Sequence, residues 1–308
     1  MKYEEIIKKI ENIIPPIPEL QKNFLKNIQH GFKIEYMCCE NIQPEIYEYD
    51  YNTNTVIINL YLINSLSKNQ EEINNLINYA LLCGLLQMSS TYSKRQIPKT
   101  CGFGSIYKKV HTERLEYIKL TKGYTELLAS EIEQRNLEEN SNNTIIMILK
   151  QLELIVGRET MLEIYFGNEK NKLEQKLKKI YPELPVKEFL ELIETIEQNE
   201  EEKENKIEYI QNMLKTLFEQ KLRQIKTQQQ KELELIKTKL EKSITAATIN
   251  FDKKIPYLYD FQEALKNSKK IEEQQKNNDE IIKKMQEDFS KWIIRKNKTK
   301  GKINEQKC

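Results

Sequence analysis

Residues 71–90 read EEINNLINYALLCGLLQMSS, and this stretch decides the fold of the first half of the chain. Its apolar side chains, from Ile73 to Met88, fall on more than one face of a helix. A helix that is apolar nearly all round is buried on all sides, because it has no polar face to expose to water. We therefore expect one central helix here, with the rest of an N-terminal domain packed around it.

The segment before this helix has the two-residue period of β-strands. Residues 32–36 and 46–49 alternate apolar and polar side chains, and residues 55–61 are rich in β-branched and aromatic ones. The polar residues 50–54 suit the turn of a hairpin between the last two strands. We expect a small antiparallel sheet of three strands near 32–61, packed on the buried helix.

The segments after the buried helix read mostly as further helices. Residues 91–112 are the exception, because they are polar and contain Pro98, Gly102 and Gly104, so we expect a long loop there. The predicted fold class is α+β and mostly helical, with an α+β domain over residues 1–185.

A long helical arm is predicted for residues 186–290. Neither Gly nor Pro occurs between Val186 and Ile244, and apolar residues at steps of three and four form a heptad seam. Pro256 predicts a turn, after which a second helix returns over residues 261–294. The arm is then either a helical hairpin within one chain or a coiled coil that self-associates through residues 200–245.

The C-terminal residues 291–308 form a basic tail with seven Lys or Arg and one Glu. We expect a flexible terminus, and its alternative role is weak attachment to nucleic acid or another acidic surface. The whole chain, with 49 Lys+Arg and 47 Asp+Glu, has a net charge of only +2. This balance argues against a nucleic-acid polyelectrolyte along its full length.

Several functional classes lack their sequence signals. The eight Gly form no phosphate-binding loop, and two histidines, His30 and His111, cannot build a His-rich metal site, so no cofactor is expected. The N-terminus does not resemble a signal peptide, and no window has 18 apolar residues, so no transmembrane segment is expected. Five cysteines without a C-x-x-C motif suggest reduced thiols and a cytoplasmic location.

Three features follow one another in an order that carries a family resemblance. They are the strand hairpin of residues 49–59, the buried helix that ends in Gly84-Leu85-Leu86-Gln87-Met88-Ser89-Ser90, and the segment Leu120-Thr121-Lys122-Gly123-Tyr124-Thr125-Glu126. This order resembles small bacterial zincin metallopeptidases of the gluzincin kind. In that family the buried helix carries H-E-x-x-H, and the third zinc ligand is the Glu of an N-E-G-x-T-E helix.

The resemblance implies a site that has lost its metal ligands. The two His positions fall on Tyr79 and Cys83, the general base falls on Ala80, and the third ligand falls on Lys122. Two His at i and i+4 share one helical face and can hold one Zn²⁺, which Tyr79 and Cys83 cannot replace. The resemblance therefore implies no catalytic residue and no metal, and a vestigial site at Tyr79, Ala80, Cys83, Lys122 and Glu126.

The lysine at the former ligand position suggests a structural substitution. Its ammonium would stand where the metal charge stood, held by an ion pair with Glu126 at i+4. The functional hypothesis is a non-catalytic pseudo-metallopeptidase that binds an unidentified protein partner through its vestigial cleft and its arm.

Two alternatives stay open at this stage. One is an active hydrolase with an unidentified site, for example a metal site or the pair Cys101 and His111, with Cys101 exposed beside its glycines and Cys83 an inert core thiol. The other is a purely structural protein that self-associates through a coiled coil.

Overall fold

The computed structural model describes most of the 308 residues of the chain. The described residues are 3–29, 31–38, 45–51, 53–92, 99–109, 112–135, 144–167, 170–196, 200–252 and 258–294. The predicted turn at Pro256 and the basic tail beyond residue 294 lie outside them.

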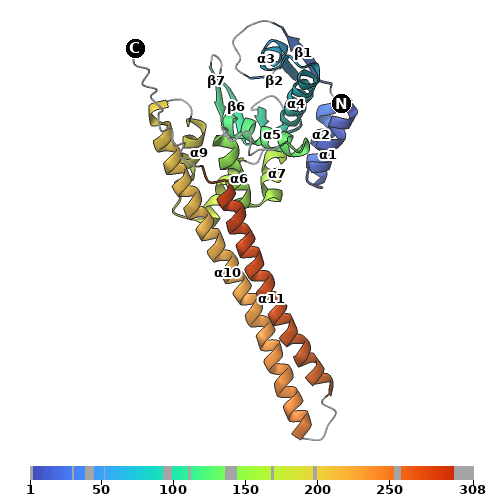
Figure 1. Ribbon diagram of the computed structural model, residues 1–308, viewed down its shortest axis with the longest axis vertical. Helices are drawn as coiled ribbons and strands as arrows, with labels where there is room; N and C mark the ends of the chain where they lie inside the picture. Colours follow the sequence, from blue (N-terminus) through green and yellow to red (C-terminus); the bar gives the residue numbers. More distant parts are fainter. Residues whose placement is uncertain are drawn as a thin grey trace, which may run out of the picture.

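The chain is predominantly helical, with two small sheets (Figure 1). The helices are α1 Tyr3–Ile13, α2 Pro18–Gln29, α3 Leu60–Leu66, α4 Gln70–Ser89, α5 Ile118–Ile132, α6 Thr144–Val156, α7 Arg158–Gly167, α8 Lys170–Ile180, α9 Val186–Glu194, α10 Glu200–Asp252 and α11 Leu258–Lys291. The strands are β1 Lys33–Met37, β2 Tyr47–Asp50, β3 Thr55–Asn59, β4 Thr91–Tyr92, β5 Lys99–Cys101, β6 Gly104–Lys109 and β7 Thr112–Glu116. The predicted α+β, mostly helical class is confirmed.

The first sheet contains the three predicted strands in the order β1-β3-β2. β2 and β3 form the expected antiparallel hairpin, but β1 pairs with β3 in parallel, so the sheet is mixed and the wholly antiparallel prediction is wrong. Only β2 and β3 follow each other through a short turn, which forces an antiparallel pair, whereas the longer connection from β1 leaves room for a crossover. The central strand β3 is mostly buried, which suits its β-branched sequence.

A second sheet replaces much of the loop expected at residues 91–112. Its four strands run β4-β5-β6-β7, and each pairs antiparallel with the next. Gly102 has φ +57° at the turn between β5 and β6, a backbone conformation that glycine adopts without strain. The next helix, α5, begins only at Ile118, because β7 occupies residues 112–116 before it.

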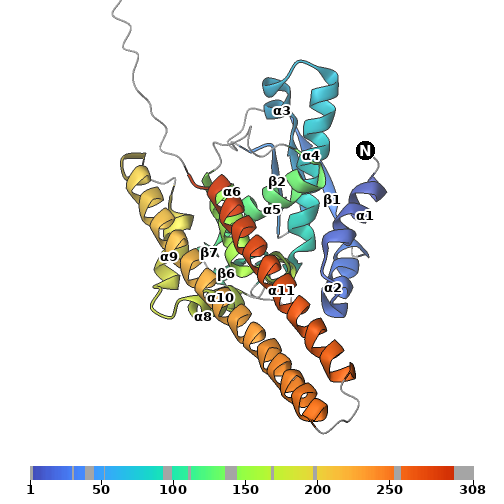
Figure 2. The same cartoon turned by 60° about the horizontal axis from the view of Figure 1, so that its bottom comes forward.

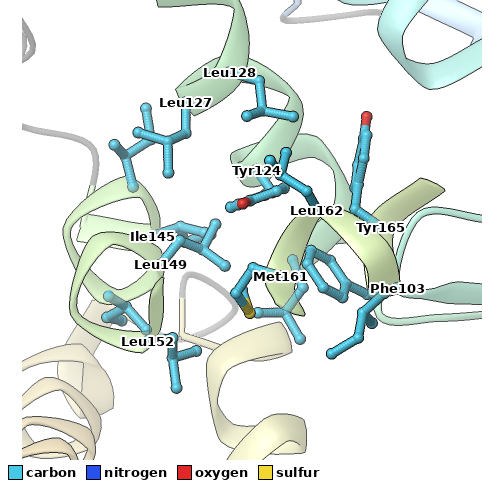
Figure 3. Packing of buried hydrophobic residues seen from close by; sticks show 14 of the residues in the cluster. Phe103, Tyr124, Leu127, Leu128, Ile145, Leu149, Leu152, Met161, Leu162 and Tyr165 are labelled. Carbon is cyan, nitrogen blue, oxygen red and sulfur yellow. The ribbon is translucent and has the colours of Figure 1, made fainter. Parts of the chain in front are cut away.

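Two helical glycines let the core helices come close to their neighbours. A Cβ on Gly84 of α4 would overlap the side chain of Val56 in β3. A Cβ on Gly123 of α5 would lie 2.5 Å from Ile145 Cγ2 and 2.8 Å from Leu149 Cδ1 of α6. Figure 3 shows the apolar side chains of α5, α6 and α7 that meet in this region, together with Phe103. At these two glycines the backbone of α4 touches a side chain of β3, and the backbone of α5 touches side chains of α6. These contacts set how closely each pair of elements can approach.

The arm is a hairpin of α10 and α11, which lie side by side in both ribbon views and project from the domain (Figures 1 and 2). The predicted heptad seam therefore faces a helix of the same chain, and its member Leu233 is buried. The predicted helical stretch from 186 is interrupted, because α9 ends where the Thr195 N–H bonds the carbonyls of Glu191 and Leu192. The apolar face of α9 and the first turns of α10, up to Leu222, are buried at the base of the arm.

Replacing Gly123 with alanine tests the close approach of α5 to α6. In an ordinary helix interior this change stabilises a protein by about 0.5–1 kcal/mol. Here we expect the free energy of unfolding in urea to fall by about 1–3 kcal/mol, because the added methyl group overpacks the contact with Ile145 and Leu149. Gly84→Ala is expected to act in the same direction. A stabilised Gly123→Ala protein would contradict this packing.

Candidate functional site

The residues that the resemblance singles out lie on α4 and α5. Tyr79, Ala80 and Cys83 lie on the apolar half of α4, where Ala80 and Cys83 are fully buried. Tyr79 and Cys83 are four residues apart and so share one face of the helix. α5 packs against α4 and contributes Glu126, which is partly buried. The structure thus brings together Tyr79, Cys83 and Glu126 from the two helices in which the resemblance places them.

Tyr79 fastens α4 to α5. Its hydroxyl donates a hydrogen bond to the backbone carbonyl of Glu126 at 3.3 Å and lies 3.2 Å from Ser130 Oγ. The guanidinium of Arg135 stacks over its ring, 4.0 Å from the ring centroid, in a cation–π contact. Burial, and to a lesser degree the neighbouring Cys83 thiol, raise the pKa of Tyr79 above its usual range. Tyr79 is therefore a neutral phenol in a packed contact.

Cys83 is buried in the core, as predicted. Its pKa is raised well above the ordinary value, first by burial and next by the negative charge of Glu126, although a hydrogen bond with Tyr79 opposes the shift. Only the thiolate is a good nucleophile or metal ligand. Cys83 therefore stays protonated at neutral pH and is suited to neither role.

Lys122 forms its ion pair with a different residue from the one that the sequence suggested. Its Nζ lies 2.5 Å from Glu45 Oε2, and both side chains are partly exposed. Glu45 precedes β2, 77 positions away in the sequence, so helical spacing could not indicate it. The pair links α5 to the first sheet, and a partly exposed pair of this kind stabilises a fold by at most about 1 kcal/mol.

The residues of α5 that match the N-E-G-x-T-E pattern have packing roles. Gly123 allows the close approach of α6 described above, and Thr125 Oγ1 donates to the carbonyl of Thr121 at 2.8 Å. The same Thr125 hydroxyl lies 2.7 Å from the buried Tyr165 hydroxyl. These residues thus serve the contacts of α5 with α6 and α7.

Of the alternative catalytic pair, only Cys101 lies in the part of the chain that the structure describes. His111 lies outside the described residues. The expectation that Cys101 is exposed is wrong, because it is buried and its Sγ contacts the carbonyl of Gln87 at 3.3 Å and Ser90 Oγ at 3.4 Å. Burial raises the pKa of the Cys101 thiol, although hydrogen bonds from Ser90 and two other side chains oppose the shift. The glycines that suggested exposure instead form the β5–β6 turn.

A buried charge network that sequence reasoning missed joins α5, α6 and α7. Glu153 is 6% exposed and accepts hydrogen bonds from the Tyr124 hydroxyl at 3.0 Å, Lys150 Nζ at 2.9 Å and Arg158 Nη1 at 2.9 Å. Glu131 pairs with the same Lys150 and Arg158. Burial disfavours the charge on Lys150, but the two carboxylates outweigh this effect and raise its pKa.

This network balances two carboxylates against two cations, so each charge lies within ion-pair distance of opposite charges. Such networks are costly to break because a lone buried charge remains. The i,i+3 spacing of Lys150 and Glu153 was its only signal in the sequence. We assign the network to the structure of the domain.

Neither a metal centre nor a membrane span is found in the part of the chain that the structure describes. Within these ranges, no three His, Cys, Asp or Glu side chains are placed together as metal ligands. Also within them, no helix has the length and apolar character needed to cross a bilayer. Comparisons of this chain with models of protein families, with curated proteins and with solved structures found no significant match.

The burial of the thiols predicts a pattern of alkylation. At pH 8, iodoacetamide should modify Cys38, which is exposed, well before Cys83 or Cys101, which are buried and have raised pKa values. Peptide mass spectrometry would follow each cysteine separately, with urea-unfolded protein as the control in which all react. Modification of Cys101 in the folded protein as fast as Cys38 would contradict the burial and revive the cysteine-nucleophile alternative.

Proposed function

We propose that this protein is a non-catalytic relative of zincin metallopeptidases that binds a protein partner. The observation that carries the proposal is the contact of Tyr79 with Glu126 and Ser130 between α4 and α5. The side chains at the former ligand positions are used there for packing, and the buried, protonated Cys83 offers no nucleophile. No step of peptide hydrolysis can be assigned to Tyr79, Ala80, Cys83 or Lys122.

The placement of α4 against α5 is what the resemblance requires. A zinc site of this kind needs two ligands on one face of a helix and a third from a neighbouring helix. Positions 79 and 83 satisfy the first condition by their spacing, and α5, which carries position 122, packs on α4. The backbone is thus consistent with a former metal site whose ligands have been substituted.

Restoring the three ligands tests this relationship. We expect the variant Tyr79→His, Cys83→His, Lys122→Glu to bind about one zinc per chain in equilibrium dialysis with elemental analysis, because the two helices then supply a tetrahedral site with one open position. The wild-type chain is expected to bind far less.

The matched control keeps Lys122 and carries only the two histidines, so it should bind zinc more weakly. A triple variant that folds by circular dichroism but binds no more zinc than the wild type would contradict the relationship.

The arm supports the binding part of the proposal. Midway along it, α10 and α11 form a groove lined mainly by polar side chains, among them Gln229, Gln230, Gln275 and Asn278. Asn278 is 7% exposed, and its Nδ2 lacks a hydrogen-bond partner among the described residues, while its Oδ1 accepts from Gln274. A buried donor without a partner costs about 1–3 kcal/mol. A partner protein that offers an acceptor in this groove would remove that cost.

Shortening the arm tests where the partner binds. A chain in which residues 226–282 are replaced by a short Gly-Ser turn keeps the base of the hairpin and should keep its folded domain. We expect a partner recovered at stoichiometric amount from native extract with the full chain to be lost with the shortened one. Equal recovery by both chains would place the binding site in the domain, and the absence of any stoichiometric partner would contradict the proposal.

A further inference from the structure

The distal end of the arm has the reverse of the usual distribution of apolar side chains. We define the tip as the described residues 244–252 of α10 and 258–265 of α11. Every large apolar side chain in the tip is between 46% and 75% exposed. These side chains are Ile244, Ile249, Phe251, Leu258, Tyr259, Phe261 and Leu265.

The buried positions of the same region carry small or polar residues. Ala264 and Asn267 are 7% and 4% exposed, whereas the neighbouring Leu265 is 50% exposed. A surface helix normally buries its large apolar side chains and exposes its polar ones. The tip therefore holds apolar surface that its own seam does not cover, and an exposed patch of this kind marks a binding surface.

The exposed side chains surround the tip rather than forming one flat face. Leu258 and Tyr259 are adjacent and so point about 100° apart, and Ile249 and Phe251 point about 200° apart, on helices with 3.6 residues per turn. A second copy or a partner helix would cover one side of the hairpin and leave the others in water. A layer of lipid headgroups and acyl chains covers an inserted tip on all sides.

A basic collar lies directly behind the tip. Asn250 Nδ2 donates to Asp260 Oδ2 at 2.7 Å, which fixes the register of the two antiparallel helices. Counting back from this pair places residues 237–243 of α10 beside residues 267–273 of α11. Together with Lys266, which directly follows the tip, these two segments contain six Lys and three Glu.

The tip itself carries three acidic residues, Asp252, Asp260 and Glu263, and the sequence between the two helices adds Lys253 and Lys254. The excess of positive charge is therefore in the collar. If the apolar tip were inserted, the lysines of the collar would lie at the level of the lipid headgroups.

We propose that the tip of the arm docks on a membrane surface that contains anionic lipids. The apolar side chains of the tip enter the boundary between headgroups and acyl chains, and the lysines of the collar contact the lipid phosphates. Ile244 lies eight residues from the end of α10, so the apolar region is about 12 Å deep, close to the insertion of about 5–10 Å that is typical of interfacial helices.

This binding site goes beyond the proposed function and does not depend on the fate of the metal site. The arm runs from Leu222 to Asp252, which at 1.5 Å per residue is about 45 Å. With the tip inserted by about 12 Å, a docked arm would hold the domain about 33 Å from the surface and leave the groove at Asn278 accessible between the two.

Co-sedimentation of the full chain with lipid vesicles tests the proposal. We expect binding to vesicles of phosphatidylcholine with phosphatidylglycerol, little binding to phosphatidylcholine alone, and weaker binding at high salt because the collar charges are screened. The tip variant Leu258→Glu, Phe261→Glu should lower the bound fraction about tenfold or more, because each change places a charge where an apolar side chain is inserted. The collar variant Lys266→Gln, Lys269→Gln, Lys270→Gln should remove most of the salt dependence.

The matched controls are Leu235→Glu and Ile281→Glu, which change exposed apolar residues of the same arm outside the tip and should bind like the wild type. Analytical ultracentrifugation of the same proteins tests the alternative that a second copy of the chain binds the tip. Failure of the wild-type chain to bind anionic vesicles would overturn the proposal, as would equal binding by the tip variant. A wild-type dimer that the tip variant converts to monomer, without vesicle binding, would assign the tip to a second copy instead. None of these results depends on zinc binding or on capture of the protein partner.

Discussion

The side-chain amide of Gln151 joins the arm to the domain, and the position of everything beyond it depends on that connection. Gln151 is fully buried in α6, and its Nε2 donates to the backbone carbonyl of Trp292 at 2.7 Å, just after the end of α11. It also exchanges hydrogen bonds with Gln211 of α10, whose Oε1 accepts from the N–H of Ile294. The two ends of the hairpin are thereby held by one residue of the domain. A fully buried amide keeps this role only because its partners satisfy it.

Apolar contacts reinforce this junction, and α6 connects it to α5 and so to the contact between α5 and α4. Phe218 of α10 and Phe289 of α11 stack with ring centroids 4.0 Å apart and an interplanar angle of 7°. On its other side, α6 packs on Gly123 of α5 and supplies Glu153 to the charge network. A helix held in this way by buried ion pairs and close packing has little freedom to shift. In this account the packed core of the domain orients the arm.

The sequence predicts those parts of the molecule that rest on a repeated pattern. The all-round apolar segment 71–90 gives α4, and the spacing of leucines and isoleucines gives the two arm helices, because burial of many side chains at a fixed period leaves a strong signal. The second sheet was missed because its strands are short and their glycines resemble loop residues. The partner of Lys122 was missed because Glu45 is distant in the sequence and only the tertiary fold brings them together. Cys101 was misplaced for a related reason, since Gly102 turns the chain and thereby buries the neighbouring thiol.

The central claim is that the domain holds the arm in one orientation through Gln151. It is tested most directly by the distance distribution between two spin labels in double electron–electron resonance. The labels would be placed on cysteines introduced at the exposed positions Lys187 of α9 and Glu273 of α11, in a chain in which Cys38, Cys39 and Cys308 are replaced by serine. The account predicts a single narrow distribution, which Gln151→Ala broadens while the helix content stays the same. A broad distribution in the chain that retains Gln151 would contradict it, because the arm would then move independently of the domain.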